Sequence, residues 1–197
     1  MVNLQTARKA LGRYFTDPAV WFLKKTPLTP NVLTWIGLLI AVGAGVLVGT
    51  GHLFAAGWVV AFSGIFDLLD GALARATNQV TRFGAVLDST LDRIGEAVVY
   101  IGLLVLYVNQ ASIIGTLLAG LGMVGSQMVS YIRARAEGIG IDCEIGVFTR
   151  PERIVILSLG LLLARFDLVL LIALGLMALL SWITAGQRLH YVWKKTK

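Results

Sequence analysis

The stretch "FDLLDGALARATNQVTRFGAVLDSTLDR", residues 66–93, places four aspartates and three arginines in the middle of an otherwise apolar chain. The chain has 197 residues, of which 57% are hydrophobic and only 14% are charged. This composition lies outside the usual range of soluble domains, so the sequence predicts an integral membrane protein. Ionisable groups inside such a chain are costly and mark functional sites by default. The question is what compensates the four aspartates.

Apolar segments surround this stretch on both sides. A spanning helix needs about 20 mostly apolar residues to cross a hydrocarbon core of roughly 30 Å. The sequence therefore predicts an all-α membrane protein with one domain over residues 1–197, made of an interfacial segment (1–28) and a six-helix bundle (29–193). The six expected transmembrane helices cover residues 31–50, 53–74, 84–108, 111–133, 152–165 and 168–187.

The basic residues predict how the chain is oriented. Residues 3–26 alternate apolar and basic groups, which is typical of an amphipathic helix on the membrane surface, whether or not it does more than anchor the chain. All of the 17 lysines and arginines except Arg165 lie near the termini or around alternate connections. The positive-inside rule then places both termini and the aspartates on the cytoplasmic side of the cell membrane. The net charge of +6 suits anionic or phosphorylated partners, and because the basic residues frame the spans we expect no nucleic acid.

The aspartates fall into two pairs on neighbouring helices. Asp67 and Asp70 stand three residues apart near the end of the second span, and Asp88 and Asp92 stand four apart near the start of the third. These spacings put each pair on one helix face. Clustered carboxylates repel one another, so they require protons, basic partners or metal ions. Ion pairs with the three arginines of the stretch, and a cation pathway, remain alternatives to a catalytic metal site.

The small residues and one arginine of the stretch favour the metal site. Gly71, Ala74 and Gly84 lie within one turn of the aspartates and would let a bulky ligand approach them. Arg75 can then bind a phosphate beside the metals, since its guanidinium matches phosphate geometry. Oxygen ligands without His or Cys indicate Mg²⁺ or Mn²⁺, and a pair of such ions bridges phosphates in displacement reactions.

The complete spacing resembles the signature of the CDP-alcohol phosphotransferase family: Asp67-x2-Asp70-Gly71-x2-Ala74-Arg75-x8-Gly84-x3-Asp88-x3-Asp92. The resemblance implies a six-span, homodimeric membrane enzyme that transfers a phosphatidyl-type group from a CDP-linked lipid to an alcohol and releases CMP. It also implies two Mg²⁺ ions, or Mn²⁺, held by the four aspartates, with Asp92 as the general base. No Ser-His, Cys-His or reactive-lysine arrangement lies near the motif, so we expect direct displacement.

The same resemblance implies the residues that bind the CDP-linked lipid. One group lies at the start of the first span, where Thr29 is a capping residue and the free backbone N–H groups favour phosphate. From the residues alone, an ordinary helix start is the favoured interpretation of this segment. The full set implied for the CDP moiety is Pro30, Asn31, Val32, Leu33, Gly71, Arg75 and Thr81.

The acceptor alcohol has to be read from other segments. "SYIRARAEG" (130–138) and "RPER" (150–153) resemble the family branch that uses myo-inositol phosphate. By that resemblance the acceptor phosphate binds Ser130, Arg133, Arg153 and Arg188. Several arginines are more than a neutral alcohol needs, although these are also ordinary positive-inside residues. Glu96 is expected to pair with Arg93 and to lie outside the site.

The sequence thus predicts transfer from CDP-diacylglycerol or CDP-archaeol to the hydroxyl of myo-inositol phosphate. Two alternatives remain open. A phosphatidylglycerophosphate synthase would use glycerol 3-phosphate and needs a similar phosphate-binding pocket. A cation-coupled transporter would move a solute without cleaving any nucleotide.

Overall fold

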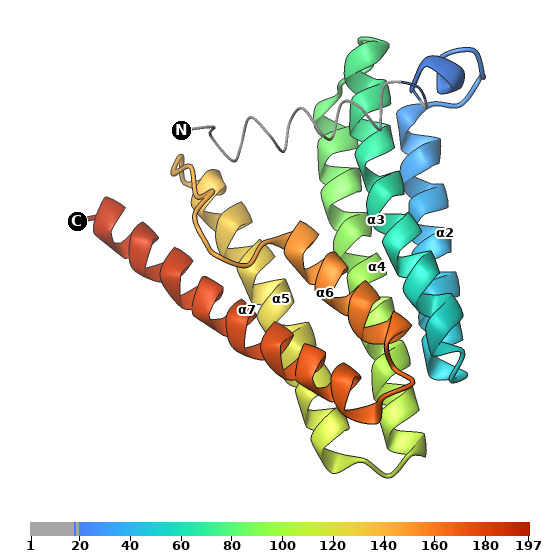
Figure 1. Ribbon diagram of the computed structural model, residues 1–197. Coiled ribbons are helices and arrows are strands. Elements are labelled where there is room, and N and C mark those ends of the chain that lie inside the picture. Colours follow the sequence, from blue (N-terminus) through green and yellow to red (C-terminus); the bar gives the residue numbers. More distant parts are fainter. Residues whose placement is uncertain (1–17, 19) are drawn as a thin grey trace, which may run out of the picture.

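The computed structural model describes residue 18 and residues 20–197. In this part of the chain all regular secondary structure is helical, which confirms the predicted all-α class. Figure 1 shows the arrangement of the helices in one bundle. They are α2 (Pro30–Gly49), α3 (Leu53–Ala76), α4 (Arg82–Asn109), α5 (Ile113–Gly138), α6 (Arg150–Leu162) and α7 (Asp167–Lys195).

The helices agree with the six predicted segments in order. α6 has 13 residues, close to the 14 of the short predicted segment 152–165, so at 1.5 Å per residue it is about 20 Å long and shorter than the hydrocarbon core. α5 continues to Gly138 and α7 to Lys195, past their predicted ends at residues 133 and 187. Four helical segments are long and apolar enough to span a membrane, namely α2, α3, α5 and residues 168–195 of α7. The multi-pass character is therefore supported, whereas the count of six spans stays a prediction.

The predicted amphipathic helix in residues 1–28 falls largely outside the described residues. The described part of it contains a helical stretch over residues 20–23. There Val20 is buried and packs with Leu33 and Leu73, while Trp21 and Phe22 are exposed. This short stretch thus has one buried and one exposed side, beside the start of α2.

Close packing between α2 and α4 aligns the ends that carry the polar residues. α2 contacts α3 and α4, α5 contacts α4 and α7, and α6 lies between α3 and α7 (Figure 1). A Cβ atom added at Gly45 would lie 2.7 Å from the carbonyl oxygen of Val98, so only glycine allows α2 to come this near to α4. The start of α2, the end of α3 and the start of α4 therefore meet at one end of the bundle.

Capping residues fix where these helices begin. The Thr29 hydroxyl accepts a hydrogen bond from the N–H of Val32 at 3.4 Å, and the Thr81 hydroxyl accepts one from the N–H of Gly84 at 2.9 Å. Both contacts satisfy amide groups that the helix itself leaves unpaired. The predicted start of the first helix after Thr29, with a proline in its first turn, is confirmed.

The connection between α5 and α6, residues 139–149, folds back along the bundle before α6 begins (Figure 1). Cys143 and Phe148 of this connection are buried. Gly146 has φ of 131°, which favours glycine, and a Cβ atom there would meet Thr184 of α7 at 2.5 Å. The connection therefore delivers the first turn of α6, with its two arginines, into the interior at the level of the aspartates.

Candidate active site

The four aspartates come from α3 and α4, and their side chains have different partners. Asp70 is buried, and its Oδ2 accepts a hydrogen bond from the Thr34 hydroxyl of α2 at 2.8 Å. Its Oδ1 accepts the N–H of Gly71 at 2.5 Å. Asp88, from α4, lines the same cavity as Asp70.

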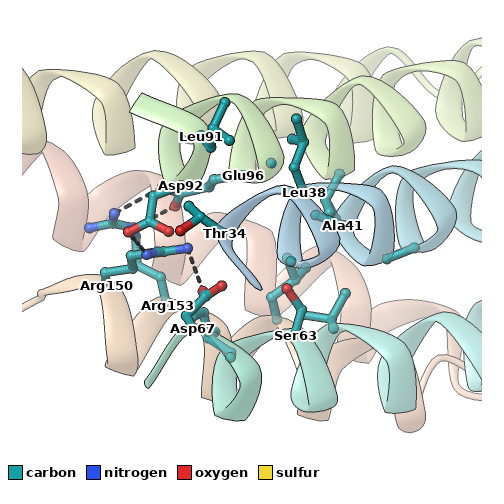
Figure 2. Close-up of a pocket in the computed structure, with 18 of the residues that line it drawn as sticks. Thr34, Leu38, Ala41, Ser63, Asp67, Leu91, Asp92, Glu96, Arg150 and Arg153 are labelled. Atoms are coloured by element: carbon teal, nitrogen blue, oxygen red, sulfur yellow. Dashed lines mark hydrogen bonds and ion pairs between the residues drawn. The ribbon is translucent and has the colours of Figure 1, made fainter. Parts of the chain in front are cut away.

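The other two aspartates meet on Arg150, at the start of α6. Its Nη2 lies 2.6 Å from Oδ2 of Asp67, and its Nη1 contacts Oδ2 of Asp92. Figure 2 shows the guanidinium between the two carboxylates. The ion-pairing alternative from the sequence named the arginines of the motif itself, whereas the partner comes from a helix more than fifty residues away. Sequence reasoning missed this residue, although it opens the "RPER" segment that was singled out for Arg153.

This pairing determines how the site relates to a metal. Among the described residues, no group of three or more His, Cys, Asp or Glu side chains is arranged to hold a metal ion. A guanidinium stands between Asp67 and Asp92, so these two carboxylates enclose a positive group. All the donors are hard oxygens. The residues therefore fit divalent cations of the Mg²⁺ or Mn²⁺ type, with one of them in place of the guanidinium.

A cavity of about 280 Å³ opens on one side of the aspartates. Five of the seven residues predicted for the CDP moiety line it together with Asp70 and Asp88: Pro30, Asn31, Gly71, Arg75 and Thr81. Val32 and Leu33 are not part of this lining, because Val32 is exposed and Leu33 is buried against Val20 and Leu73. Gly84 also lines the cavity, and a Cβ atom there would lie 2.9 Å from the Thr81 hydroxyl oxygen.

A second cavity, of about 610 Å³, opens on the other side. All four residues predicted for the acceptor phosphate line it, although they come from three helices: Ser130, Arg133, Arg153 and Arg188. Asp92 lines this cavity, and Asp88 lines both cavities. Asp88 therefore stands where two cavities meet, and the larger of the two is lined by five arginines and five carboxylates.

The arginines of the larger cavity differ in how they are held. Arg188 is 3% exposed and donates to the backbone carbonyls of Ile145 at 2.8 Å and Val129 at 2.6 Å. Arg188 therefore also ties the connection before α6 to α5. Arg133 is partly exposed and pairs with Glu137 at 2.7 Å and more loosely with Glu144 at 3.4 Å.

Arg153 is only 2% exposed and makes a two-pronged ion pair with Glu96 of α4. The distances are 2.6 Å from Nε to Oε1 and 3.0 Å from Nη2 to Oε2 (Figure 2). The expectation that Glu96 pairs with Arg93 is wrong, because Arg93 instead donates to the carbonyl of Ser89. The spacing within one helix suggested Arg93, and nothing in the sequence showed that α6 would pack against this turn of α4.

Comparison with known proteins identifies this constellation. A sequence model of the CDP-alcohol phosphatidyltransferase family matches residues 27–190, a range that includes the four aspartates and the residues lining both cavities. The chain belongs to the CDP-alcohol phosphatidyltransferase family. The predicted family is thereby confirmed, and the chain is an enzyme of the transferase class.

Several members of the CDP-alcohol phosphatidyltransferase family resemble the chain over nearly its whole length. The phosphatidylinositol phosphate synthase of Mycobacterium tuberculosis is 42% identical over 197 aligned positions, which cover 95% of this chain and 89% of the relative. The archaetidylinositol phosphate synthase of Methanothermobacter thermautotrophicus is 36% identical, covering 94% and 92% of the two chains.

Solved structures of the Mycobacterium tuberculosis synthase have the same fold. The crystal structure with CDP-DAG bound has a TM-score of 0.83 at 39% identity and covers 90% of this chain and 93% of the other. A second crystal structure of that synthase, with the same TM-score, is a complex with manganese and citrate. The relative thus binds a CDP-linked lipid, and its crystals accept a divalent cation.

Proposed function

We propose that this protein transfers a phosphatidyl-type group from a CDP-linked lipid to a hydroxyl of myo-inositol phosphate and releases CMP. The observation that carries the proposal is the pair of cavities on either side of the aspartates, with Asp88 in the lining of both. The relatives named for inositol phosphate synthases, bacterial and archaeal, favour this acceptor over glycerol 3-phosphate. They leave CDP-diacylglycerol and CDP-archaeol as equivalent donors.

The smaller cavity would hold the nucleotide half of the donor. Arg75 can bind a phosphate oxygen, and the helix start at Pro30 and Asn31 adds backbone amides. Gly71 and Gly84 line this cavity and have no side chain to fill it, and a Cβ atom at Gly84 would lie 2.9 Å from the Thr81 hydroxyl oxygen. These features position the diphosphate beside the aspartates without requiring a covalent intermediate.

The four aspartates would hold two Mg²⁺ ions, with Mn²⁺ as a substitute. When bound, such ions neutralise the diphosphate and the charge that develops on the leaving group. Thr34 would keep Asp70 in place through its hydroxyl, as it does in this structure. Arg150 would have to release Asp67 and Asp92 before these carboxylates could serve as ligands.

Asp92 would act as the general base. The acceptor's hydroxyl oxygen attacks the lipid-bearing phosphorus, and the bond from that phosphorus to the bridging oxygen breaks. CMP leaves with the bonding electrons, and the hydroxyl proton passes to the Asp92 carboxylate, which lines the acceptor cavity. Positioning in two adjacent cavities supplies the in-line geometry that this displacement needs.

The acceptor's phosphate would bind in the larger cavity, to Arg153 with Ser130, Arg133 and Arg188. Arg188 would contribute mainly by fixing the backbone around the cavity, because two of its nitrogens already donate to backbone carbonyls. The enzyme would be a homodimer with six spans in the cell membrane, and both termini and the site would face the cytoplasm. The distribution of the lysines and arginines along the chain supports this orientation.

One assay tests the function. CMP release is measured with purified protein and CDP-diacylglycerol, with inositol phosphate, glycerol 3-phosphate, inositol or serine offered in turn, with and without Mg²⁺ or Mn²⁺. We expect CMP only with a divalent cation and most of it with inositol phosphate. Preference for glycerol 3-phosphate would overturn the assigned acceptor. Solute uptake into vesicles without nucleotide cleavage would overturn the assignment of an enzymatic function.

A variant tests the base. In Asp92→Asn we expect turnover to fall at least about a hundredfold, as is usual when a general base is lost. Mn²⁺ binding, measured in parallel, separates loss of the base from loss of the metal site. A variant that keeps most of its turnover with the cations bound would show that another group takes the proton.

A further inference from the structure

We propose that Glu96 is a positioning residue that aims the guanidinium of Arg153 at the acceptor's phosphate. This inference rests on the proposed function and assigns a role to a residue outside the aspartate motif. It concerns how one buried arginine is held, and it adds no step to the reaction.

The first observation is that Glu96 continues the face of α4 that carries the site. It follows Asp92 by four residues, as Asp92 follows Asp88, so the three carboxylates form one stripe with a rise of about 6 Å per step. Glu96 lines the 610 Å³ acceptor cavity. It also lines a third cavity, of about 50 Å³, beside Asp67. Its contact with Arg153 therefore lies about one helical turn from the proposed base.

The second observation is the geometry of the pair. Both carboxylate oxygens of Glu96 are engaged, one by Nε and one by Nη2 of Arg153. A two-pronged contact fixes the plane of a guanidinium, whereas a single hydrogen bond leaves it free to turn. The pair joins α4 to α6, so the orientation of Arg153 is set by the packing of two helices rather than by its own flexible side chain.

The third observation concerns the guanidinium nitrogen of Arg153 that Glu96 does not bind. Nη1 of Arg153 is buried and has no hydrogen-bond partner among the described residues. An unpaired buried N–H group of a charged side chain costs a large part of its desolvation free energy, so such groups are rare in finished structures. Arg153 lines the acceptor cavity, so a phosphate oxygen that entered there and displaced the atoms covering Nη1 would satisfy this donor.

Charge alone would predict the opposite effect of Glu96. A carboxylate near a bound phosphate repels it, so a purely electrostatic view makes Glu96 unfavourable to the acceptor. Orientation and charge are separated by Glu96→Asp, which keeps the charge but shortens the side chain by one methylene. The shorter carboxylate cannot reach both nitrogens, so the guanidinium loses its fixed plane.

The test compares Glu96→Asp with Glu144→Asp as a matched control. Glu144 also pairs with an arginine of the same cavity, but it is exposed and its contact of 3.4 Å is weak. Two quantities are measured: the KM of whichever phosphorylated acceptor the wild type uses best, and the inhibition constant of inorganic phosphate against that acceptor.

For Glu96→Asp we expect both constants to rise by about tenfold or more, the value of one hydrogen bond to a charged group. The kcat and the KM of the CDP-linked lipid should stay within about twofold, since neither depends on the phosphate contact. Glu144→Asp should behave as the wild type. Unchanged or tighter phosphate binding in Glu96→Asp would overturn the inference.

A double-mutant cycle shows whether Glu96 acts through Arg153. Arg153→Lys keeps the charge but loses the fork, so Glu96→Asp should add little when made on top of it. Additive effects would mean that the two residues act separately and would refute the positioning role. If Glu96→Asp does not fold, Glu96→Gln takes its place in the same cycle. Its amide oxygen can accept from one nitrogen of Arg153, but its NH₂ group is a donor and cannot accept from the other, so the two-pronged contact is lost.

The outcomes also separate this inference from the proposed function. If the wild type prefers glycerol 3-phosphate, the assigned acceptor fails while the phosphate measurements still test Glu96. If the wild type uses inositol phosphate but Glu96→Asp leaves both constants unchanged, the function stands and the positioning role fails. Use of unphosphorylated alcohols alone, with no inhibition by phosphate, overturns both.

Discussion

Replacing Arg150 by glutamine should make the protein bind divalent cations more tightly. In this structure the guanidinium holds both Asp67 and Asp92, so a cation has to displace it before it can use these oxygens. The three side chains are 30%, 17% and 20% exposed, which places the contact between a surface pair and a fully buried one. Surface pairs contribute up to about 1 kcal/mol and breaking buried ones costs about 3 to 5, so we take about 2 kcal/mol.

The same free energy affects two measured quantities: the substitution lowers the stability of the metal-free protein and raises its affinity for the metal. Without metal, Arg150→Gln leaves two carboxylates uncompensated, and a loss of about 2 kcal/mol lowers the melting temperature by roughly 4 to 8 °C for a chain of this size. With metal, the variant no longer has to displace the arginine, so its Kd for Mn²⁺ should fall by about thirtyfold. Mn²⁺ in excess should therefore remove the difference in melting temperature.

The detergent-solubilised protein is titrated with Mn²⁺, and binding is measured by calorimetry or from the electron paramagnetic resonance signal of free Mn²⁺. Melting curves are recorded in chelator and in excess Mn²⁺. Arg135→Gln is the control, because Arg135 is an exposed arginine of α5. An unchanged or weaker Mn²⁺ affinity in Arg150→Gln, or a melting deficit that persists in metal, would refute the idea that the guanidinium occupies the place of a cation.

Three further predictions test the packing around the site. Gly45→Ala should destabilise the protein by about 1 to 3 kcal/mol in chemical unfolding, because the added methyl meets α4, whereas Gly43→Ala meets nothing within 4 Å and should be nearly neutral. Thr34→Val should weaken Mn²⁺ binding by about tenfold, since Asp70 loses a hydrogen bond, and Thr34→Ser should restore it. Burial raises the pKa of the Cys143 thiol, so maleimide should label the native protein slowly at pH 7, faster as the pH rises, and rapidly once it is unfolded.

Local patterns in the chain were sufficient to predict the helices. Thr29 marks a helix start because its side chain accepts a hydrogen bond from an amide only three residues away, and such a contact depends on neighbouring sequence. Thr81 makes the same contact at the start of α4. The same holds for the aspartates, whose spacing fixes a shared face within each helix. The end of α7 was harder to predict, because the length of an apolar segment does not show how far the helix continues beyond it.

The sequence by itself determined the fold class, the family and the face on which each aspartate lies, because these depend on composition, helical periodicity and a motif contained within 26 residues. Only the tertiary structure decided which cations meet which carboxylates. Arg150 reaches Asp67 and Asp92, and Arg153 reaches Glu96, because the connection before α6 folds back and sets its first turn against α3 and α4. Pairing across 57 or 83 residues is a property of helix packing, and periodicity within one helix contains no information about it.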